Sequence, residues 1–157
     1  MKKEPVTNLV FNEVVSRLKN IQAGDKYWCS PKVYDYKKTV EQSECPAIIL
    51  YQADDAWNTG SQASPANEAM GNVKINIDQQ IIIAVFHESV EKLNRLKADI
   101  EIALLNGTGN LLLRTDSNPP VTYKLGGPTM ALPPDDLALG NARFILTAFY
   151  QRQHGDP

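Results

Sequence analysis

Few side chains in this 157-residue chain are of the types that catalyse reactions or bind metal ions. The two histidines, His87 and His154, are far apart in the sequence, and neither lies at metal-ligand spacing from another His or Cys. Cys29 and Cys45 also lack a partner at short spacing, and nothing local supports a Cys–His nucleophile pair. We therefore predict no catalytic role for these four residues, and we interpret His87 as a surface residue near a helix start.

Two acidic pairs and one glycine-bearing segment could suggest ion or phosphate binding. Asp54-Asp55 and Asp135-Asp136 lack the further ligands of a calcium or magnesium loop, and we interpret them as solvated loop charges. The segment 106–110 (NGTGN) follows an expected helix, whereas phosphate-binding loops precede one, so we interpret it as a turn. The sequence predicts no metal, no cofactor and no enzymatic activity.

Composition and charge indicate one ordinary globular domain over residues 1–157. The chain is 43% hydrophobic and 22% charged, and its net charge of −2 argues against a strongly basic nucleic-acid binder. Cys29 and Cys45 could pair across a hairpin, but we favour two free thiols in a reducing compartment. The start of the chain lacks an apolar signal region, and no apolar run reaches the length of a membrane span. We therefore expect a cytoplasmic, soluble protein without a membrane partner.

The stretch from Val73 to Leu105 is the unit around which we expect the fold to form. Alternating apolar residues from Val73 to Val85 predict a strand with one buried and one wet face, and from Ile81 both faces are apolar and should be covered. Ser89 can then cap an amphipathic helix that buries residues Val90, Leu93, Leu96, Ile100, Ala103 and Leu104.

That strand is long for so small a domain. About 13 residues at roughly 3.3 Å each span some 43 Å, which exceeds a compact domain diameter of about 40 Å. Either the strand bends near residues 78–80, or it projects from the body and needs a partner to cover it.

The remaining elements follow from shorter patterns. A first helix should begin near Thr7 or Asn8, and further strands should occupy 47–51, 111–113 and 142–150. We expect a hairpin over 28–44, a long polar loop over 53–72 that carries Trp57, and chain breaks at 126–128 and 133–136. The order predicts an α+β fold: a mostly antiparallel sheet with two amphipathic helices packed on one face, the other face being wet or shared with a neighbour.

The whole pattern resembles the tail terminator (tail completion) family of long-tailed bacteriophages. The motifs are the strand Pro46-Ala47-Ile48-Ile49-Leu50, the helical Leu-x-x-Asp-Ile over 96–100, and a closing Arg-x-x-Gly-Asp-Pro over 152–157 after a tyrosine-bearing strand. The resemblance covers most of the chain from about residue 8, and the segment 118–136, with its two Pro-Pro pairs, is less typical.

The resemblance implies a structural virion protein of the tail and neck, made in the host cytoplasm. It would form a homo-oligomeric ring, typically a hexamer, on the tail tube protein, end tube polymerisation and offer the surface on which the head-tail connector protein docks. DNA would pass through the lumen without sequence-specific binding. For the contacts between subunits we expect Trp57, Tyr150, Arg152 and Asp156, since aromatic residues and arginine often dominate interfaces.

Two alternatives remain open at this point. The chain could be another neck or head-completion protein of a phage. It could also be a small α+β ligand-binding or enzymatic domain with its pocket on the uncovered sheet face.

Overall fold

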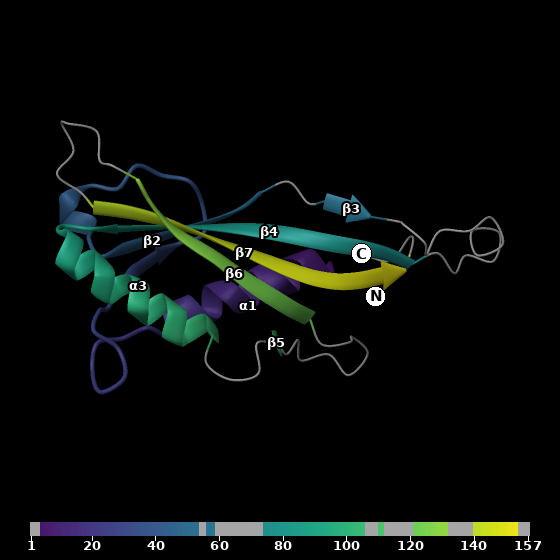
Figure 1. Ribbon diagram of the computed structural model, residues 1–157, viewed down its shortest axis with the longest axis horizontal. Coiled ribbons are helices and arrows are strands. Elements are labelled where there is room, and N and C mark those ends of the chain that lie inside the picture. Colours follow the sequence, from purple (N-terminus) through teal and green to yellow (C-terminus); the bar gives the residue numbers. More distant parts are fainter. Residues whose placement is uncertain are drawn as a thin grey trace.

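The computed structural model describes residues 4–53, 56–58, 74–105, 110–111, 121–131 and 140–153. Within this part of the chain, two α-helices pack against one sheet of seven strands (Figure 1). In chain order the elements are α1 (Val6–Lys19), β1 (Lys32–Tyr34), a 3₁₀ turn (Gln42–Glu44), β2 (Ala47–Gln52), β3 (Ala56–Asn58), β4 (Lys74–His87), α3 (Val90–Leu105), β5 (Asn110–Leu111), β6 (Val121–Ala131) and β7 (Gly140–Gln153).

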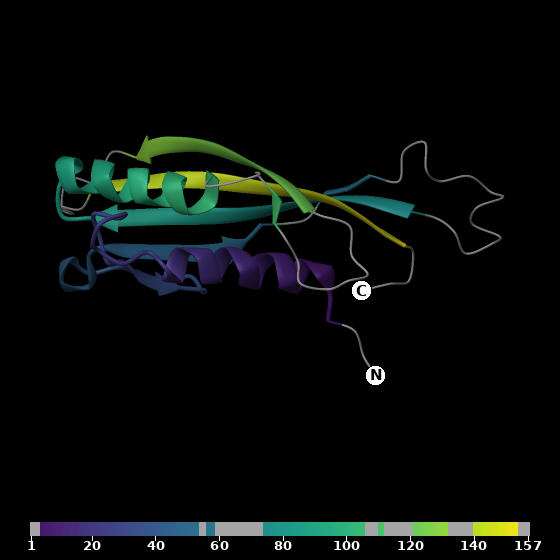
Figure 2. The same ribbon diagram turned by 90° about the horizontal axis from the view of Figure 1, so that it is seen from below.

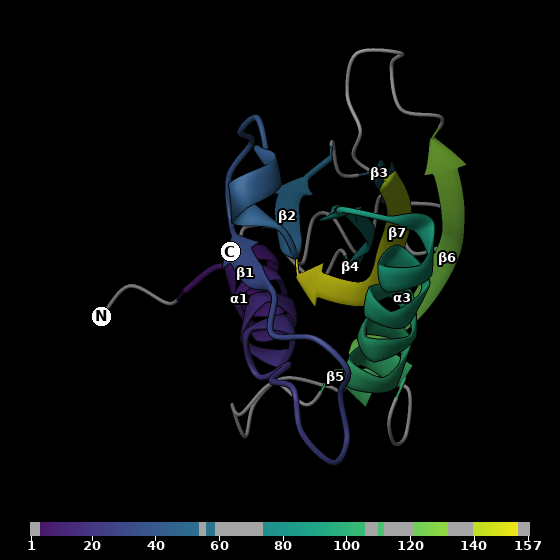
Figure 3. The same cartoon turned by 90° about the vertical axis from the view of Figure 1, so that its left-hand side faces the viewer.

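The sheet has the order β1-β2-β4-β7-β6-β5, and the short β3 also pairs with β4. Every pairing is antiparallel except that of β1 with β2. The helices α1 and α3 lie on the same face of this sheet, as the view from the helical side and the end-on view show (Figures 2 and 3). The predicted α+β class, with a mostly antiparallel sheet and both helices on one face, is confirmed.

The two longest strands form the axis of the sheet. β4 and β7 pair without a register shift from Lys74↔Gln153 to His87↔Gly140, so β4 has no bulge against β7 near residues 78–80. β2 pairs with β4 only from Ile81 to Phe86, and the pairing of β6 with β7 reaches no farther than Phe149. β4 and β7 therefore continue past β2 and β6, and among the described strands only the short β3 lies beside β4 in this part, pairing at residues 76–78 (Figure 1). We call the projecting pair, residues 74–80 of β4 and 147–153 of β7, the ribbon.

The core lies between the sheet and the two helices. The odd-numbered residues of β4 from Ile75 to Val85 are all buried, as their alternation predicts. They pack in one cluster with buried side chains of both helices, namely Val10, Val14, Val15, Leu18, Leu93, Leu96, Ile100 and Leu104. The stripe of α3 thus buries most of the residues that its spacing selects, but Ala103 is only partly buried and Val90 is exposed. Val90 is 60% exposed, because it is the first residue of α3 and lies outside the packed turns.

A second, smaller cluster covers part of the opposite face of the sheet. Val40, Ala47 and Ile49 are buried there, and Ala84 and Phe86 of β4 pack against them. The end of β4 predicted to be covered on both faces is therefore covered near β2. On the β7 side, no helix among the described residues covers the outer face.

Three local predictions are wrong, each for a reason that local patterns do not reveal. The segment 28–44 is not a hairpin: β1 pairs in parallel with β2, since the intervening loop and 3₁₀ turn bring the chain back in the same direction. α1 begins at Val6 after Pro5, so Thr7 and Asn8 lie inside its first turn instead of capping it. The expected break at 126–128 is a bulge within the strand β6.

Candidate interaction surfaces

The outer face of the sheet, opposite the helices, carries exposed apolar side chains. Ile145 and Phe149 of β7 are 39% and 38% exposed. They point to this face because their neighbours Phe144, Leu146 and Ala148 are buried against the helices and side chains alternate along a strand. We call this area the open face.

Charged and polar residues flank the apolar ones on the open face. Phe149 lies directly opposite Asp78 of β4 on one side and Thr122 of β6 on the other. Lys124 of β6 lies opposite Thr147, and its side chain is exposed. Among the residues whose side chains the structure describes, Asp78 forms no salt bridge. The open face therefore combines the Phe149 ring on β7 with an acidic group on β4 and a basic group on β6, the two strands that flank β7.

A buried polar network ties the ribbon to the start of α1. Gln79 is fully buried, and its side-chain amide donates to the Thr7 carbonyl at 2.9 Å. The Tyr150 hydroxyl donates to Gln79 Oε1 at 3.1 Å and lies 3.1 Å from Thr7 Oγ1. Because the tyrosine proton is engaged with Gln79, the threonine hydroxyl is the donor in the last contact. The network satisfies polar groups that would be costly to bury unpaired.

Three of the four predicted interface residues lie on the ribbon or on β3 beside it. One of them, Tyr150, has its side chain buried in its own subunit. Trp57 in β3 and Tyr150 in β7 pair with Ile77 of β4 from opposite sides, and Arg152 pairs with Ile75. The Tyr150 side chain is only 8% exposed and belongs to the core, so its hydroxyl serves the network with α1.

Several other predicted features fall outside the described residues. These are Asp156, His154, Asp54-Asp55, Asp135-Asp136 and the turn at 106–109, together with most of the polar loop over 53–72.

A second surface lies on the helical side, where a loop places Trp28 in solvent. The indole is 65% exposed, yet the backbone beneath it is fixed. Asp99 of α3 is fully buried, and its carboxylate accepts the Trp28 amide at 2.9 and 3.0 Å and the Cys29 amide at 2.8 Å. A carboxylate that accepts several backbone N–H groups forms strong, charge-assisted hydrogen bonds. The loop after α1 is thereby held against α3.

Arg95, one turn before Asp99, lies over the Trp28 ring. Its guanidinium carbon is 5.2 Å from the ring centroid, which is within cation–π range. Arg95 also forms a salt bridge of 2.9 Å with Glu91, and the two side chains are 48% and 78% exposed. Such an exposed helical pair is weak, so Arg95 can exchange it for a partner's carboxylate at little cost.

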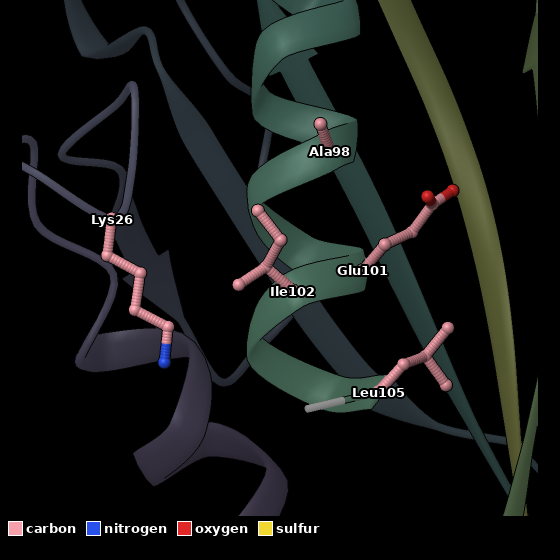
Figure 4. Close-up of a pocket in the computed structure, with 5 residues that line it drawn as sticks. All are labelled: Lys26, Ala98, Glu101, Ile102 and Leu105. Carbon is pink, nitrogen blue, oxygen red and sulfur yellow. The ribbon is translucent and has the colours of Figure 1, made fainter. Parts of the chain in front are cut away.

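A shallow depression borders the same helix at its C-terminal half. Ala98, Glu101, Ile102 and Leu105 of α3 form one wall, and Lys26 approaches from the loop (Figure 4). Its volume is about 450 Å³, and Leu105 is 52% exposed. Its lining has one carboxylate and one amine and is otherwise apolar, so we interpret it as a surface groove beside the Trp28 loop.

Both cysteine side chains lie in environments that lower the reactivity of their thiols. Burial, together with the neighbouring Asp99, raises the pKa of the Cys29 thiol to about 11, so it stays protonated near neutral pH. Burial and then the nearby Glu88 and Glu44 raise the pKa of Cys45. Both thiols are free, with Cys29 buried and Cys45 half-buried.

His87 is buried, so its interpretation as a surface residue is wrong. His87 is the last residue of β4, and its side chain is buried on the same face as the odd-numbered residues before it. The alternating apolar residues end at Val85, so they do not reveal this position. The predicted cap beside it does form, since Ser89 Oγ accepts the Lys92 amide at 3.3 Å.

Among the described residues, no group of three His, Cys, Asp or Glu side chains is placed to hold a metal ion. In the same part of the chain, no helix is both long and apolar enough to cross a membrane.

Sequence reasoning did not find Trp28, Arg95 or Asp99 as an assembly, although Asp99 lies in the Leu-x-x-Asp-Ile motif. The hydrogen bonds join residues 70 and 71 positions apart, which no local spacing reveals. One signal was available: an aspartate on the apolar stripe of α3, next to Ile100, is a residue that needs a buried partner.

Comparison of the chain with protein-family models gave no match, and no curated protein matches it.

Proposed function

We propose that this protein is a tail terminator: a structural virion protein that closes the end of a phage tail tube as a homo-oligomeric ring. In this role it stops tube polymerisation and presents a docking surface to the head-tail connector, while DNA passes through the lumen. The protein is made in the host cytoplasm and remains in the tail and neck of the virion. Its partners are further copies of itself, the tail tube protein and the connector.

The observation that carries this proposal is the ribbon. β4 and β7 continue past both β2 and β6, where, among the described strands, only the short β3 still pairs with β4, at residues 76–78, and the outer edge of β7 has no strand partner from Tyr150 to Gln153. A strand pair of this kind offers backbone edges and side chains to another protein instead of completing its own sheet. Arg152 lies on the ribbon and Trp57 lies on β3, which pairs with the ribbon, and these positions suit contact with the tube or a neighbouring subunit.

The motif residues also have structural roles that support the resemblance. Leu96 and Ile100 are fully buried beneath the sheet, and Asp99 between them holds the Trp28 loop. The strand of the Pro46–Leu50 motif becomes β2, which lies beside β4. These residues therefore maintain the scaffold from which the ribbon projects.

Tail tubes assembled without their terminator provide the direct test. Adding the purified wild-type chain should produce capped tube ends in electron micrographs and should block further growth when tube protein is supplied. Trp57→Ala and Arg152→Ala should remain folded but cap poorly, whereas Tyr36→Ala, at an exposed aromatic residue away from the ribbon, should cap normally.

Two results would count against parts of the proposal. Normal capping by both ribbon variants would remove Trp57 and Arg152 from the contact. Failure of the wild-type chain to associate with tail tubes would overturn the assignment as a terminator, and a stable monomer that binds a small molecule on the open face would favour the ligand-binding alternative.

A further inference from the structure

The two surfaces described above match each other in chemistry. The Trp28 patch, which we define as Trp28, Arg95 and Glu91, combines an exposed aromatic ring with a cation and an anion. The Phe149 patch, on the open face, also combines an aromatic ring with one acidic and one basic group. The two patches of one subunit cannot contact each other, because one lies on the helical side and the other on the open face.

The Phe149 patch consists of Phe149, Asp78 and Lys124. Asp78 and Lys124 lie on the strands either side of β7, so the apolar ring has an acidic group on one flank and a basic group on the other. If Trp28 packs on Phe149, Arg95 can meet Asp78 while Glu91 meets Lys124. Aromatic packing then supplies the buried area, and the two charge pairs set the orientation.

We infer that the contact between neighbouring subunits is heterologous, with the Trp28 patch of one copy seated on the Phe149 patch of the next. The inference rests on the proposed function, since it names the surfaces that build the ring. A contact between two different faces of the same chain repeats around an axis and closes when the rotation per subunit divides the circle. The fixed backbone beneath Trp28 reduces the conformational freedom lost on binding, which favours this residue as an anchor.

Sedimentation velocity on the full chain, without tail tubes, tests the contact over concentrations up to about 1 mM. Trp28→Ala and Phe149→Ser should each weaken self-association by at least about thirtyfold, the effect expected for an interface hot spot. Tyr36→Ala is the matched control, because Tyr36 is 56% exposed and lies on neither patch, and it should associate like wild type. Circular dichroism establishes that each variant is folded.

Mixing the two variants separates this geometry from a symmetric one. A Trp28→Ala subunit keeps its Phe149 patch, and a Phe149→Ser subunit keeps its Trp28 patch. An equimolar mixture can therefore form one intact contact per pair and should give dimers that do not grow further, while each variant alone stays monomeric. Absence of those dimers overturns the heterologous contact.

Charge exchange provides a second, independent readout. Arg95→Asp alone and Asp78→Arg alone should each weaken association by about tenfold, and a chain that carries both changes should recover to within about threefold of wild type. Lys92→Asp, on the same helix but outside the patch, should have little effect. Lack of recovery in the double variant overturns the pairing of Arg95 with Asp78.

Failure of the contact and failure of the proposed function give different results. A wild-type chain that stays monomeric up to about 1 mM, or variants that associate normally, overturn the contact even if the chain caps tail tubes. A chain that forms the predicted contact but never binds tubes supports the contact and overturns the function.

Discussion

At the scale of single residues, Asp99 shows how one buried carboxylate positions a distant loop. Its oxygens accept the amides of Trp28 and Cys29, and both groups would lose their partner in Asp99→Ala. Because an unpaired buried donor costs about 1–3 kcal/mol, we expect the variant to lose about 2–5 kcal/mol of unfolding free energy. Urea unfolding measures this loss, and Glu101→Ala on the exposed side of α3 is the control. A loss below about 1 kcal/mol would show that the bonds contribute little.

His87 makes a second prediction at this scale, for the dependence of stability on pH. Burial, followed by the charge of Lys92, lowers its pKa from the ordinary value of 6.5, while Glu88 acts in the opposite direction. Its Nδ1 accepts the Glu88 amide at 2.8 Å, a bond that requires an unprotonated nitrogen. The unfolded chain therefore binds a proton more readily than the folded chain. The stabilising contribution is complete above about pH 6.5 and is lost progressively as the pH falls from there through the lower pKa of His87 in the folded chain.

Urea unfolding at stepped pH checks this sign. The free energy of unfolding should decline on acidification below about pH 6.5, and His87→Asn, which keeps an acceptor but cannot be protonated, should flatten that decline. The other histidine gives the matched control, since His154→Asn should leave the slope in place. An unchanged slope in His87→Asn would contradict the assignment.

At the scale of elements, the bulge in β6 depends on a glycine. Gly127 has φ of +102°, and a Cβ there would lie 2.8 Å from the Arg143 carbonyl oxygen of β7. Gly127→Ala should therefore cost more than about 1 kcal/mol of unfolding free energy, because both the backbone conformation and the space exclude a side chain. Gly126→Ala is the matched control, since its Cβ would meet only an ordinary contact of 3.5 Å with the Ile145 carbonyl. Equal losses in the two variants would refute the steric account.

The elements also show what the sequence could and could not predict. The period-two pattern located β4 and β7, and the 3.6-residue pattern located both helices. Each of these four elements buries one continuous stripe of side chains against the same core. β6 was missed, since Gly126-Gly127-Pro128 has the composition of a chain break although the strand continues through it. The parallel pairing of β1 with β2 and the bonds from Asp99 to Trp28 depend on contacts between distant segments, so no local pattern contains them.

At the scale of the whole molecule, the ribbon should be the least protected part of the central strand pair. Between Ile81 and Phe86, β4 is flanked by β2 and β7, whereas at Gln79 and Gln80 it pairs only with β7 among the described strands. We therefore expect amide hydrogen exchange of β4 in the free subunit to be faster at residues 74–75 and 79–80 than over residues 81–86, with an intermediate rate at residues 76–78, which pair with the short β3. Uniform protection along β4 in a demonstrated monomer would contradict this pattern.

The buried network should slow exchange at the base of the ribbon. Gln79→Met keeps the volume of the side chain but removes the bonds to Thr7 and Tyr150, so exchange there should increase. Gln151→Met is the matched control, because within the described part of the chain the Gln151 side chain bonds to Asn76 on the exposed side, at 2.7 Å, and to neither Thr7 nor Tyr150. Equal acceleration in both variants would show that the network does not hold the ribbon.

The same network couples the ribbon mechanically to α1. Gln79 and Tyr150 join the ribbon to the first turn of α1 through their hydrogen bonds with Thr7. A force that bends the tip is therefore carried into α1 at one end of the helix, while α3 packs against the body of the sheet. In the proposed function, a partner that docks on the ribbon would therefore also act on the tilt of α1 through these hydrogen bonds.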